Sequence, residues 1–568
     1  MFSWAGRARA LTRSNSRATS SPAASHFPQR LCTAAHEPDL HIPLTRSWLD
    51  ECLASHKACS VTVAATAAAS SMPTRVIEVG APGSPTRLVA TSPAAQEAYL
   101  ALSYCWGPGA DTFTLTRRTM QSMLLEIDEA ALARTHREVL ALARAHAIRY
   151  VWIDALCIVQ GDAEDWERES KRMEQVYENA TVTIVAGRAD DARNGFVAND
   201  YRPAAEPCAV PLGSDPAQGE LFVALPRSRA VGPVETRGWC FQEAVLSRRA
   251  IVYGAEQLMF RCRTGTIAED FGKKSAATKT ASAGSPEAAF IAAINAPPET
   301  RREQMLNEWY HVVSQYSKRR LSNPHDVFAA VSSLARLTQH GLQSRYLAGV
   351  WESDLVPGLM WIPFHHHWSK HPPLKRPSPT KFAPPPVTRA PSWSWAAVEG
   401  PVFYTYRGLP KFRRPGFITA RPALGRPGRW SPKPDADCDA GVLHVPSLEL
   451  HVTARVVRAG IAAVSMSARE YLVSAKEDTR RLGKVVTNGV LLRPADSVGP
   501  PDLIFGIGRF DLEEEACDEV WCLQLTYDDG LMLVRDDGSG FRRRGRFQLL
   551  TEHRGWFERQ DEMETCLV

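Results

Sequence analysis

The strongest constraint on the fold comes from residues 98–263, where apolar, strand-like runs alternate with segments of helical periodicity. The strand candidates in this block are AYLALSYCW, RYVWIDALCIV, ATVTIVAG and RRAIVYG. Between them, residues 128–147 and 162–180 carry apolar side chains at helical spacing. This alternation predicts an α/β fold with a doubly wound, mostly parallel sheet. Ligands of such sheets bind beyond the carboxyl ends of the strands, so the loops that follow the runs are the expected location of a site.

The segments on either side of this block differ from it in composition and predict further regions. Residues 1–40 are rich in Arg, Ser and Ala without an acidic residue before Glu37, as in a disordered tail or a mitochondrial presequence. Residues 45–97 predict a lead-in helix followed by short strands, and residues 273–300 have the low complexity of a linker or insertion. We expect the chain to continue with a helical region and Pro-rich connector (301–403), a basic linker (404–440) and a β-rich carboxyl-terminal region (441–568).

Bulk composition excludes several classes of protein. The chain has 568 residues, of which 44% are hydrophobic and 23% charged, as in soluble globular proteins. No apolar run is long enough to span a bilayer, so we expect no membrane span. The net charge of +5 is small for this length, and the basic stretch at 405–434 is rich in proline. These features favour a solvated linker over a nucleic-acid-binding surface, and we expect no nucleic-acid partner.

Cysteine usage bears on the compartment and on metal binding. Twelve scattered cysteines without a CxxC pair favour a reducing compartment. We therefore expect a cytoplasmic protein, with the mitochondrion as the alternative that the amino-terminal composition raises. Cys52, His56 and Cys59 have i, i+4, i+7 spacing, and zinc could use three such ligands with a fourth from elsewhere in the chain. A chance grouping is the favoured interpretation, so the sequence leads us to expect no metal site.

The residues that follow the first two strand candidates are candidate ligand-binding residues. Tyr104, Trp106 and Gly107 end the first run, and a glycine there lets the backbone approach a phosphate, although a plain turn is the favoured interpretation. Asp154 ends the second run, where an acidic side chain is costly unless it is hydrogen-bonded or used. Its alternative role is to anchor the following loop by accepting backbone N–H bonds. No GxGxxG or Walker sequence occurs, which argues against a Rossmann or P-loop enzyme.

Three segments of the block together resemble the fungal heterokaryon-incompatibility (HET) domain: YLALSYCWG, YVWIDALCIVQGDAEDWERESKRMEQVYENATVTIVAG and RGWCFQEAVLSRRAIVYG. They occur in the family's order, and TRSWLDECLASHKAC before them and RAPSWSWAAVEGPV after them resemble the sequences that usually flank the domain. The resemblance implies a role in non-self recognition, in which fusion of incompatible fungal cells triggers programmed cell death. It also implies a protein partner in an incompatibility or death-signalling assembly, and self-association on activation.

The HET domain is in turn similar to the Toll/interleukin-1 receptor (TIR) domain, whose sheet is flavodoxin-like and some members of which cleave NAD. In those members a Trp-Cys pair precedes a catalytic glutamate, and Trp239-Cys240-Phe241-Gln242-Glu243 matches this pattern. The resemblance implies that Glu243 is catalytic and that NAD is a substrate rather than a permanently bound cofactor. Trp239 lies one turn earlier on the same face and is a candidate for stacking on a ring of NAD, although packing is the favoured interpretation. Cys240 stands where those enzymes often carry a serine. This difference weakens the inference of a shared reaction more than the inference of a shared fold.

A single carboxylate is enough for this chemistry. Cleavage of the nicotinamide–ribose bond forms an oxocarbenium-like ribosyl centre, and nicotinamide leaves as a neutral pyridine without a general acid. One carboxylate that binds the ribose hydroxyls and stabilises the developing positive charge then suffices.

Two alternatives stay open. In the first, Glu243 is not catalytic: it either binds a ligand or is a structural carboxylate that caps a loop or pairs with Arg237 or Arg248, and Trp239 serves in packing. In the second, the domain is a non-enzymatic signalling module that propagates assembly through its surface.

Overall fold

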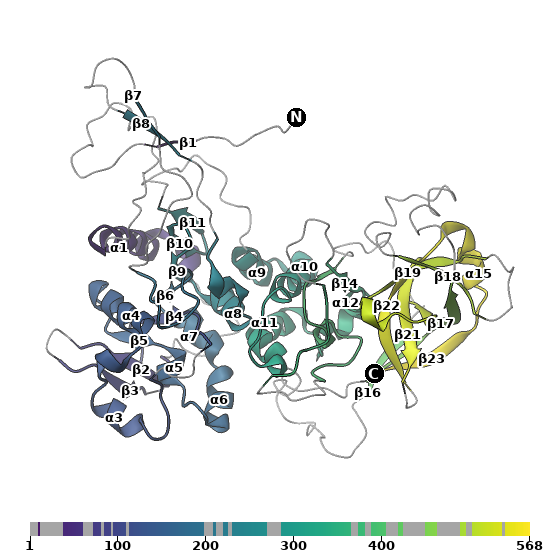
Figure 1. The fold of residues 1–568 in the computed structure, drawn as a ribbon, viewed down its shortest axis with the longest axis horizontal. Coiled ribbons are helices and arrows are strands. Elements are labelled where there is room, and N and C mark those ends of the chain that lie inside the picture. The colour runs from purple at the N-terminus through teal and green to yellow at the C-terminus, as the bar shows by residue number, and fades with distance from the viewer. Residues whose placement is uncertain are drawn as a thin grey trace. The chain divides into compact units, whose positions relative to one another are not determined.

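The computed structural model of the chain consists of two compact units, Met1–Asn295 and Ala296–Val568, each of which is described by itself (Figure 1). The predicted tail (1–40) and basic linker (404–440) lie largely outside the described residues. Of the predicted linker or insertion (273–300), residues 286–300 are described, and they form the helix Pro286–Ile294 and the start of the helix Pro298–Tyr316. The structure describes residues 9–11, 38–60, 72–80, 84–92, 95–108, 113–197, 208–211, 220–224, 230–269, 286–364, 373–380, 388–404, 419–423, 449–462, 489–495, 503–536 and 540–568.

The first unit contains an eight-stranded sheet whose four central strands are parallel and lie in the order β9–β6–β4–β5 (Figure 1). These strands are β4 (Tyr99–Ser103), β5 (Tyr150–Trp152), β6 (Val182–Val185) and β9 (Arg249–Tyr253). All of their residues except Tyr150 are buried, as expected of parallel strands that are covered on both faces. The parallel α/β core predicted from the alternating runs is therefore confirmed.

Antiparallel strands extend this sheet on both sides. β10 (Leu258–Cys262) and β11 (Gly265–Ala268) continue it beyond β9, and β2 (Arg75–Glu78) and β3 (Arg87–Ala90) continue it beyond β5. The strand order reverses at β4, because the chain places β5 on one side of β4 and then β6 on the other. In a doubly wound sheet, such a reversal marks the crevice in which ligands bind.

Helices connect the parallel strands. α4 (Arg134–Ala145) precedes β5, and α8 (Trp239–Leu246) precedes β9. Between β5 and β6 lie α5 (Asp154–Cys157), α6 (Ala163–Ser170) and α7 (Met173–Asn179). Right-handed crossovers place α4 on one face of the sheet and the helices after β5 on the other, where α7 packs against α8.

The first unit also contains short peripheral elements. α1 (Pro38–Ser55) and α2 (Lys57–Ser60) precede the sheet, and α1 packs against β10. The others are α3 (Met120–Leu125), α9 (Pro286–Ile294), and a small sheet of β1 (Arg9–Leu11), β8 (Glu220–Ala224) and β7 (Cys208–Pro211).

Two predicted elements differ from the structure. The run RYVWIDALCIV, predicted as one buried strand, forms the three-residue β5 and then α5, so Asp154 begins a helix instead of ending a strand. Periodicity does not separate a buried strand from a buried helical turn in so short an apolar run. The helix predicted over 162–180 is divided into α6 and α7, because the amide of Arg172 donates to the carbonyl of Glu169 at 2.9 Å, a tighter turn than the α-helix makes.

The second unit begins with helices that bury aromatic side chains. α10 (Pro298–Tyr316) packs against α11 (Ser332–Leu342), within the region predicted to be helical. The ring centroids of Trp309 and Trp351 lie 5.3 Å apart, and those of Tyr310 and Tyr404 lie 4.4 Å apart. The short elements that follow are β12 (Tyr346–Leu347), β13 (Val350–Trp351), α12 (Leu355–Leu359), β14 (Trp361–Pro363) and β15 (Val402–Tyr404).

The rest of the second unit confirms the predicted β-rich region. Six antiparallel strands of this region pair in the order β17 (Glu449–Ile461), β18 (Val490–Pro494), β19 (Gly506–Phe510), β22 (Phe541–Leu549), β21 (Asp529–Arg535) and β20 (Glu519–Gln524). β20 also pairs with β17, so the six strands close into a ring. Phe505, Met532 and Phe547 belong to the apolar cluster at its core. β16 (Thr419–Ala423) and β23 (Glu562–Leu567) pair with the first half of β17.

A buried arginine links the ring to the preceding segment of the same unit. The side chain of Arg543 is 0% exposed and pairs with Asp511 at 2.7 Å. It also donates to the carbonyl oxygens of Leu359 and Trp361 at 2.6 and 2.7 Å, and its guanidinium carbon lies 3.5 Å from the centroid of the Trp361 ring. The planar, permanently charged guanidinium suits such a set of acceptors. The charge is therefore buried but fully partnered.

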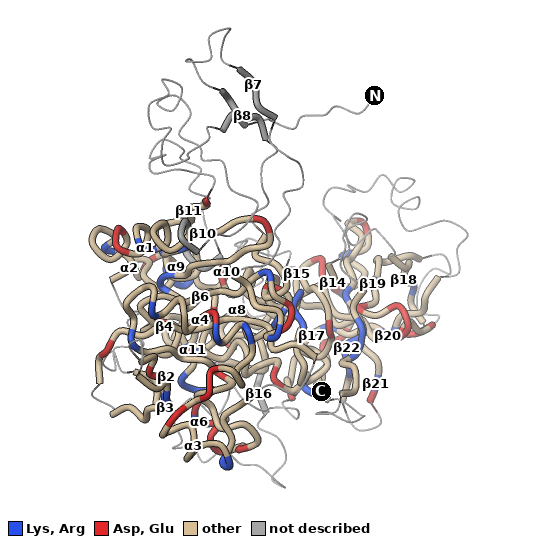
Figure 2. Tube along the Cα trace, turned by 60° about the vertical axis from the view of Figure 1, so that its left-hand side comes forward, with Lys and Arg blue, Asp and Glu red and all other residues tan. Residues whose placement is uncertain are grey.

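Charged residues of both signs are intermixed along the described chain (Figure 2). Many of them pair, as Arg75 does with Asp165 at 2.6 Å. The basic stretch at 405–434 lies largely outside the described residues. Among the described helices, none combines the length and the apolar character that crossing a bilayer requires.

Candidate functional site

Polar side chains come together in the first unit at the carboxyl ends of β4 and β5 and the first turns of α8. Ser103 is the last residue of β4 and is followed by Tyr104, while Asp154 comes two positions after the end of β5. These two strands are parallel neighbours, so their carboxyl ends meet at one edge of the sheet. α8 carries Cys240 and Glu243, which are three residues apart and therefore adjacent on the helix surface.

Glu243 is the most strongly perturbed carboxyl group of this cluster. The residue is 5% exposed, and its carboxyl group is hydrogen-bonded to the side chains of Ser103 and Cys240. Burial raises its pKa from 4.5 to about 7, while the hydrogen bond with Ser103 and the charge of Arg237 oppose the rise. Its Oε2 atom has no hydrogen-bond partner among the described residues. The carboxyl group therefore changes its charge near neutral pH and keeps one buried oxygen without a hydrogen-bond partner among the described residues.

Asp154 is half-buried and held by several donors. Its carboxylate accepts a hydrogen bond from the indole nitrogen of Trp106 at 2.8 Å and another from the amide of Ala155 at 2.7 Å. Burial raises its pKa, and the charge of Arg237 and the bond from Trp106 oppose the rise. The Tyr104 hydroxyl is a further hydrogen-bond partner. The backbone amide among these donors belongs to α5 itself, so anchoring of the following loop, the alternative role considered from the sequence, stays a prediction.

Arg237 is the cation of the cluster. It follows a short 3-10 helix, Pro233–Thr236, and its guanidinium donates to the carbonyl oxygen of Tyr104. Burial disfavours its charge, but Cys240, Glu243 and Asp154 keep its pKa above the ordinary value. The charge of Arg237 lowers the pKa values of both Asp154 and Glu243. This proximity is what the interpretation of Glu243 as a structural carboxylate paired with Arg237 requires. The other arginine considered, Arg248, is not among the main causes of the pKa shift of Glu243.

Cys240 is a buried thiol that donates hydrogen bonds. Burial, followed by the neighbouring Glu243, raises its pKa well above the ordinary value, so the thiol stays protonated at neutral pH. Its sulfur lies 3.9 Å from the carbonyl oxygen of Tyr104. A protonated thiol of this kind positions its neighbours and is not a nucleophile.

Two tryptophans lie next to the buried carboxyl group at partly exposed positions. Trp239 is one helical turn before Glu243, and its ring meets that of Trp166 edge-on with centroids 6.2 Å apart. Trp106 and Trp239 are both half-buried, whereas Glu243 is buried. The cluster thus passes from aromatic side chains that reach solvent to an interior carboxyl group.

Gly107 is needed for the turn after β4. Its φ of +90° lies in the left-handed region, and a Cβ atom there would stand 2.1 Å from Oδ2 of Asp191. Asp191 is fixed in turn by an ion pair with Arg193 at 2.6 Å. This agrees with the plain turn favoured from the sequence. The approach of Gly107 to a phosphate stays a prediction.

The structure therefore brings together Tyr104, Trp106, Asp154 and Glu243, with Trp239 one turn away. The sequence reasoning gave no role to two further members, Ser103 and Tyr177. The Tyr177 hydroxyl donates to the carbonyl of Leu102 at 3.1 Å and is also hydrogen-bonded to Glu243. Ser103 could have been found, since it is the last residue of the strand, but nothing in the sequence marks Tyr177. Among the described residues, two groups of side chains could hold a metal ion, and neither of them includes Glu243 or Asp154.

Comparison with known proteins matches residues 99–243 to the family model described as "Heterokaryon incompatibility protein (HET)". The match begins at the first residue of β4 and ends at Glu243, so it spans the cluster described above. No curated protein and no solved structure matches the chain. The resemblance seen in the sequence is thus confirmed for residues 99–243, which match the heterokaryon incompatibility (HET) family model.

Proposed function

We propose that the HET domain hydrolyses NAD, with Glu243 as the catalytic carboxylate, and that this activity drives cell death in an incompatibility response. The observation that carries the proposal is a buried carboxyl group with a pKa of about 7 and one unpartnered oxygen at the switch point of a parallel sheet. An acidic group buried without full compensation is costly, and such costs concentrate at functional sites.

The order of the parallel strands supports a TIR-like interpretation. Numbered along the chain, the four central strands lie in the order 2-1-3-4, which is the order of the first four strands in flavodoxin-like sheets. The position next to the fourth strand is taken by the antiparallel β10. The likeness therefore concerns the core that positions Glu243 and not the margin of the sheet.

The side chains of the cluster suit the demands of the reaction. Ionised Glu243 would bind ribose hydroxyls through Oε2 and stabilise the oxocarbenium-like centre as nicotinamide leaves. The positive charge of the oxidised nicotinamide ring favours ionisation of this carboxyl group when the substrate binds. The half-buried Trp106 and Trp239 offer surfaces for stacking, and Arg237 offers a charge for the pyrophosphate. Ser103 and Cys240 orient the carboxylate by hydrogen bonds, so a donor is retained although cysteine replaces the serine of the motif.

The proposal is tested in living cells in which the full chain triggers death, because self-association on activation is part of it. Free nicotinamide and total NAD are measured for the wild type, for Glu243→Gln and for Glu167→Gln. Glu167 is a matched control on α6, 63% exposed and paired with Lys171. We expect the wild type and Glu167→Gln to consume NAD and kill, and Glu243→Gln to do neither.

Two results would contradict the proposal. The first is an unchanged NAD pool while the wild type kills. The second is undiminished NAD loss and killing by Glu243→Gln. Killing without NAD loss would favour the non-enzymatic signalling module that acts through its surface.

A further inference from the structure

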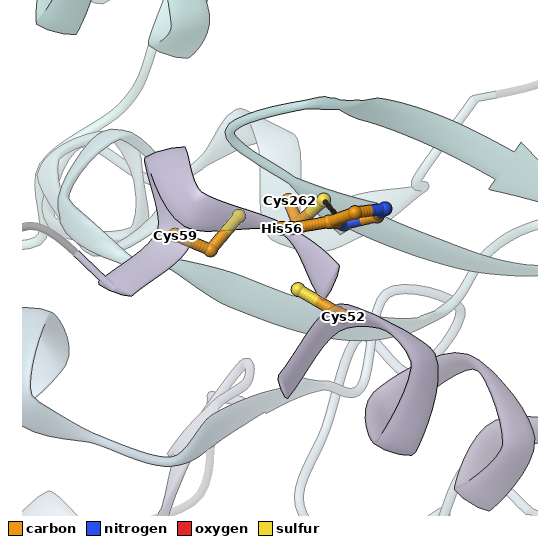
Figure 3. A group of neighbouring side chains, drawn as sticks. All are labelled: Cys52, His56, Cys59 and Cys262. Carbon is orange, nitrogen blue, oxygen red and sulfur yellow. Dashed lines mark hydrogen bonds between the residues drawn. The ribbon is translucent and has the colours of Figure 1, made fainter. Parts of the chain in front are cut away.

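A second cluster of reactive side chains lies at the end of the first unit's sheet, separate from the Glu243 cluster. Cys52, His56, Cys59 and Cys262 converge there, with their ligand atoms all within 4.8 Å of one another (Figure 3). The Sγ atom of Cys262 lies 3.5 Å from Nδ1 of His56. The side chains of Cys52 and Cys59 are also hydrogen-bonded to each other and to Cys262.

We propose that these four residues form a structural Zn²⁺ site with a Cys₃His ligand set. Zinc prefers four tetrahedral ligands of this kind, with Zn–S of about 2.3 Å and Zn–N of about 2.0–2.1 Å. Tetrahedral bonds of these lengths separate a sulfur from a nitrogen by about 3.6 Å and two sulfurs by about 3.8 Å. The distance of 3.5 Å between Sγ of Cys262 and Nδ1 of His56 agrees with the first of these values. All pairs of ligand atoms lie within 4.8 Å of each other, so the remaining ligands need to move only slightly closer together to bind one ion.

The local backbone explains how three ligands come from one short segment. Cys52 lies in the last turn of α1, His56 lies between the two helices, and Cys59 lies in α2. The amide of His56 donates to the carbonyl of Cys52 at 3.1 Å, and that of Cys59 to the carbonyl of His56 at 2.9 Å. These bonds bend the chain so that its three side chains face one point (Figure 3). The fourth ligand, Cys262, ends β10 opposite Gly265 of β11.

Hydrogen-bond donors surround two of the sulfurs, those of Cys59 and Cys262. The backbone amide of Arg263 is hydrogen-bonded to the sulfur of Cys59, and the amide of Thr264 to the sulfur of Cys262. The Thr264 hydroxyl lies 3.6 Å from the sulfur of Cys59. Donors of this second layer orient metal ligands and stabilise their negative charge. The guanidinium of Arg249 donates to the carbonyl oxygen of Cys59 at 3.1 Å and so holds the backbone of this ligand.

Burial and ligand count indicate a structural role for the metal. The three cysteines are buried and only His56 is half-buried. Four protein ligands leave no position for a water or a substrate, which distinguishes a structural zinc site from a catalytic one. No residue of this cluster belongs to the Glu243 cluster, so the inference does not depend on the proposed hydrolase activity.

The metal would fasten the amino-terminal helices to the margin of the sheet. Cys262 follows His56 by 206 positions, so the site closes a long loop of chain. α1 otherwise meets this margin through Trp48, whose ring centroid lies 6.4 Å from that of Phe260, and through His41, which lies 3.5 Å from Glu269. Zinc binding therefore contributes to the stability of the whole unit.

The test is metal content of the full chain purified without chelator under reducing conditions. We expect one equivalent of zinc per chain for the wild type and for Cys157→Ala, which removes a buried cysteine of the same unit outside the cluster. Cys262→Ala should lose the zinc. Replacement by Co²⁺ should give the visible bands of a tetrahedral site and the charge-transfer bands of cobalt–thiolate bonds. A strong chelator should lower the midpoint of thermal unfolding of the wild type and leave that of Cys262→Ala unchanged.

A conservative variant keeps the test decisive if Cys262→Ala fails to fold. His56→Cys preserves four ligands and should retain zinc while strengthening the cobalt–thiolate bands, whereas His56→Ala should lower the metal content. Absence of zinc and of the cobalt spectrum in the reduced wild type overturns the proposal. So does the same zinc content in Cys262→Ala as in Cys157→Ala. A disulfide between two of the cluster's cysteines in the freshly purified chain, shown by two missing thiols without bound metal, overturns it as well.

Discussion

Replacing Glu243 by glutamine should stabilise the protein, and the gain should depend on pH. The pKa of about 7 in the folded chain exceeds the ordinary value of 4.5. The folded state therefore holds the proton more tightly than the unfolded state, and stability falls as the pH rises from 4.5 to about 7. A difference of about 2.5 pKa units at about 1.4 kcal/mol each lowers the free energy of unfolding by about 3 kcal/mol above neutral pH. At about pH 5 the same relation gives a loss of stability of less than about 1 kcal/mol.

The amide cannot ionise, so Glu243→Gln removes this cost. We expect the variant to gain about 2–3 kcal/mol more at about pH 8 than at about pH 5, relative to the wild type. For a unit of this size that corresponds to roughly 2–4 °C in the unfolding midpoint per kcal/mol. The assay is thermal unfolding of the full chain followed by tryptophan fluorescence, because Trp106, Trp166 and Trp239 lie around the site.

A second buried carboxylate serves as a control, because its replacement by glutamine should change the stability in the opposite direction. Glu178 is 1% exposed and paired with Arg263 at 3.2 Å, so Glu178→Gln should destabilise the chain at about pH 8 by removing the charge of a buried ion pair. A Glu243→Gln variant that loses stability equally at both pH values would refute the reasoning. The carboxyl group would then be ionised and compensated in the folded state, and its burial would carry no cost.

Further predictions concern pH, a turn and a buried charge. Nicotinamide release should rise with pH through an apparent pKa near 7, because ionised Glu243 is the active form; a rate that falls over this interval would contradict that assignment. Gly107→Ala should lower the unfolding midpoint by more than the equivalent of about 1 kcal/mol, since it forces a side chain into a positive φ against Asp191. Arg543→Ala should cost about 3–5 kcal/mol in chemical denaturation, because Asp511 is left buried without its cation, whereas the double replacement with Asp511→Ala should recover part of that loss.

The fold of the first unit was largely predictable because its strands are buried on both faces. Such strands are continuous apolar runs separated by amphipathic helices, and that pattern is visible without coordinates. The margins of the sheet were less predictable, since an antiparallel hairpin such as β10–β11 follows β9 with no helix to mark the change of direction. The end of β5 was misjudged because Ile153 and the three α5 residues after Asp154 are as apolar as the strand.

The candidate site was predictable only where its members follow strands or match a motif. Tyr104, Asp154 and Glu243 were found in this way, and the structure brings them together. Tyr177 reaches Glu243 from a helix whose apolar face predicted only packing. Cys262 could not be joined to the cysteines of the lead-in helix, because the contact depends on how the sheet is ordered and not on spacing along the chain.

The extent of the sheet decides which fragments of this protein can be handled in isolation. The family match covers 99–243, which includes β4, β5 and β6 but leaves out their outer neighbours β2 and β9. A fragment cut at those bounds would turn two interior strands into exposed edges, with apolar faces and unpaired backbone groups that recruit further copies into aggregates. Recombinant work on the domain should therefore keep residues 38–295 as a minimum, since the compact unit ends at Asn295 and α9 packs against α8.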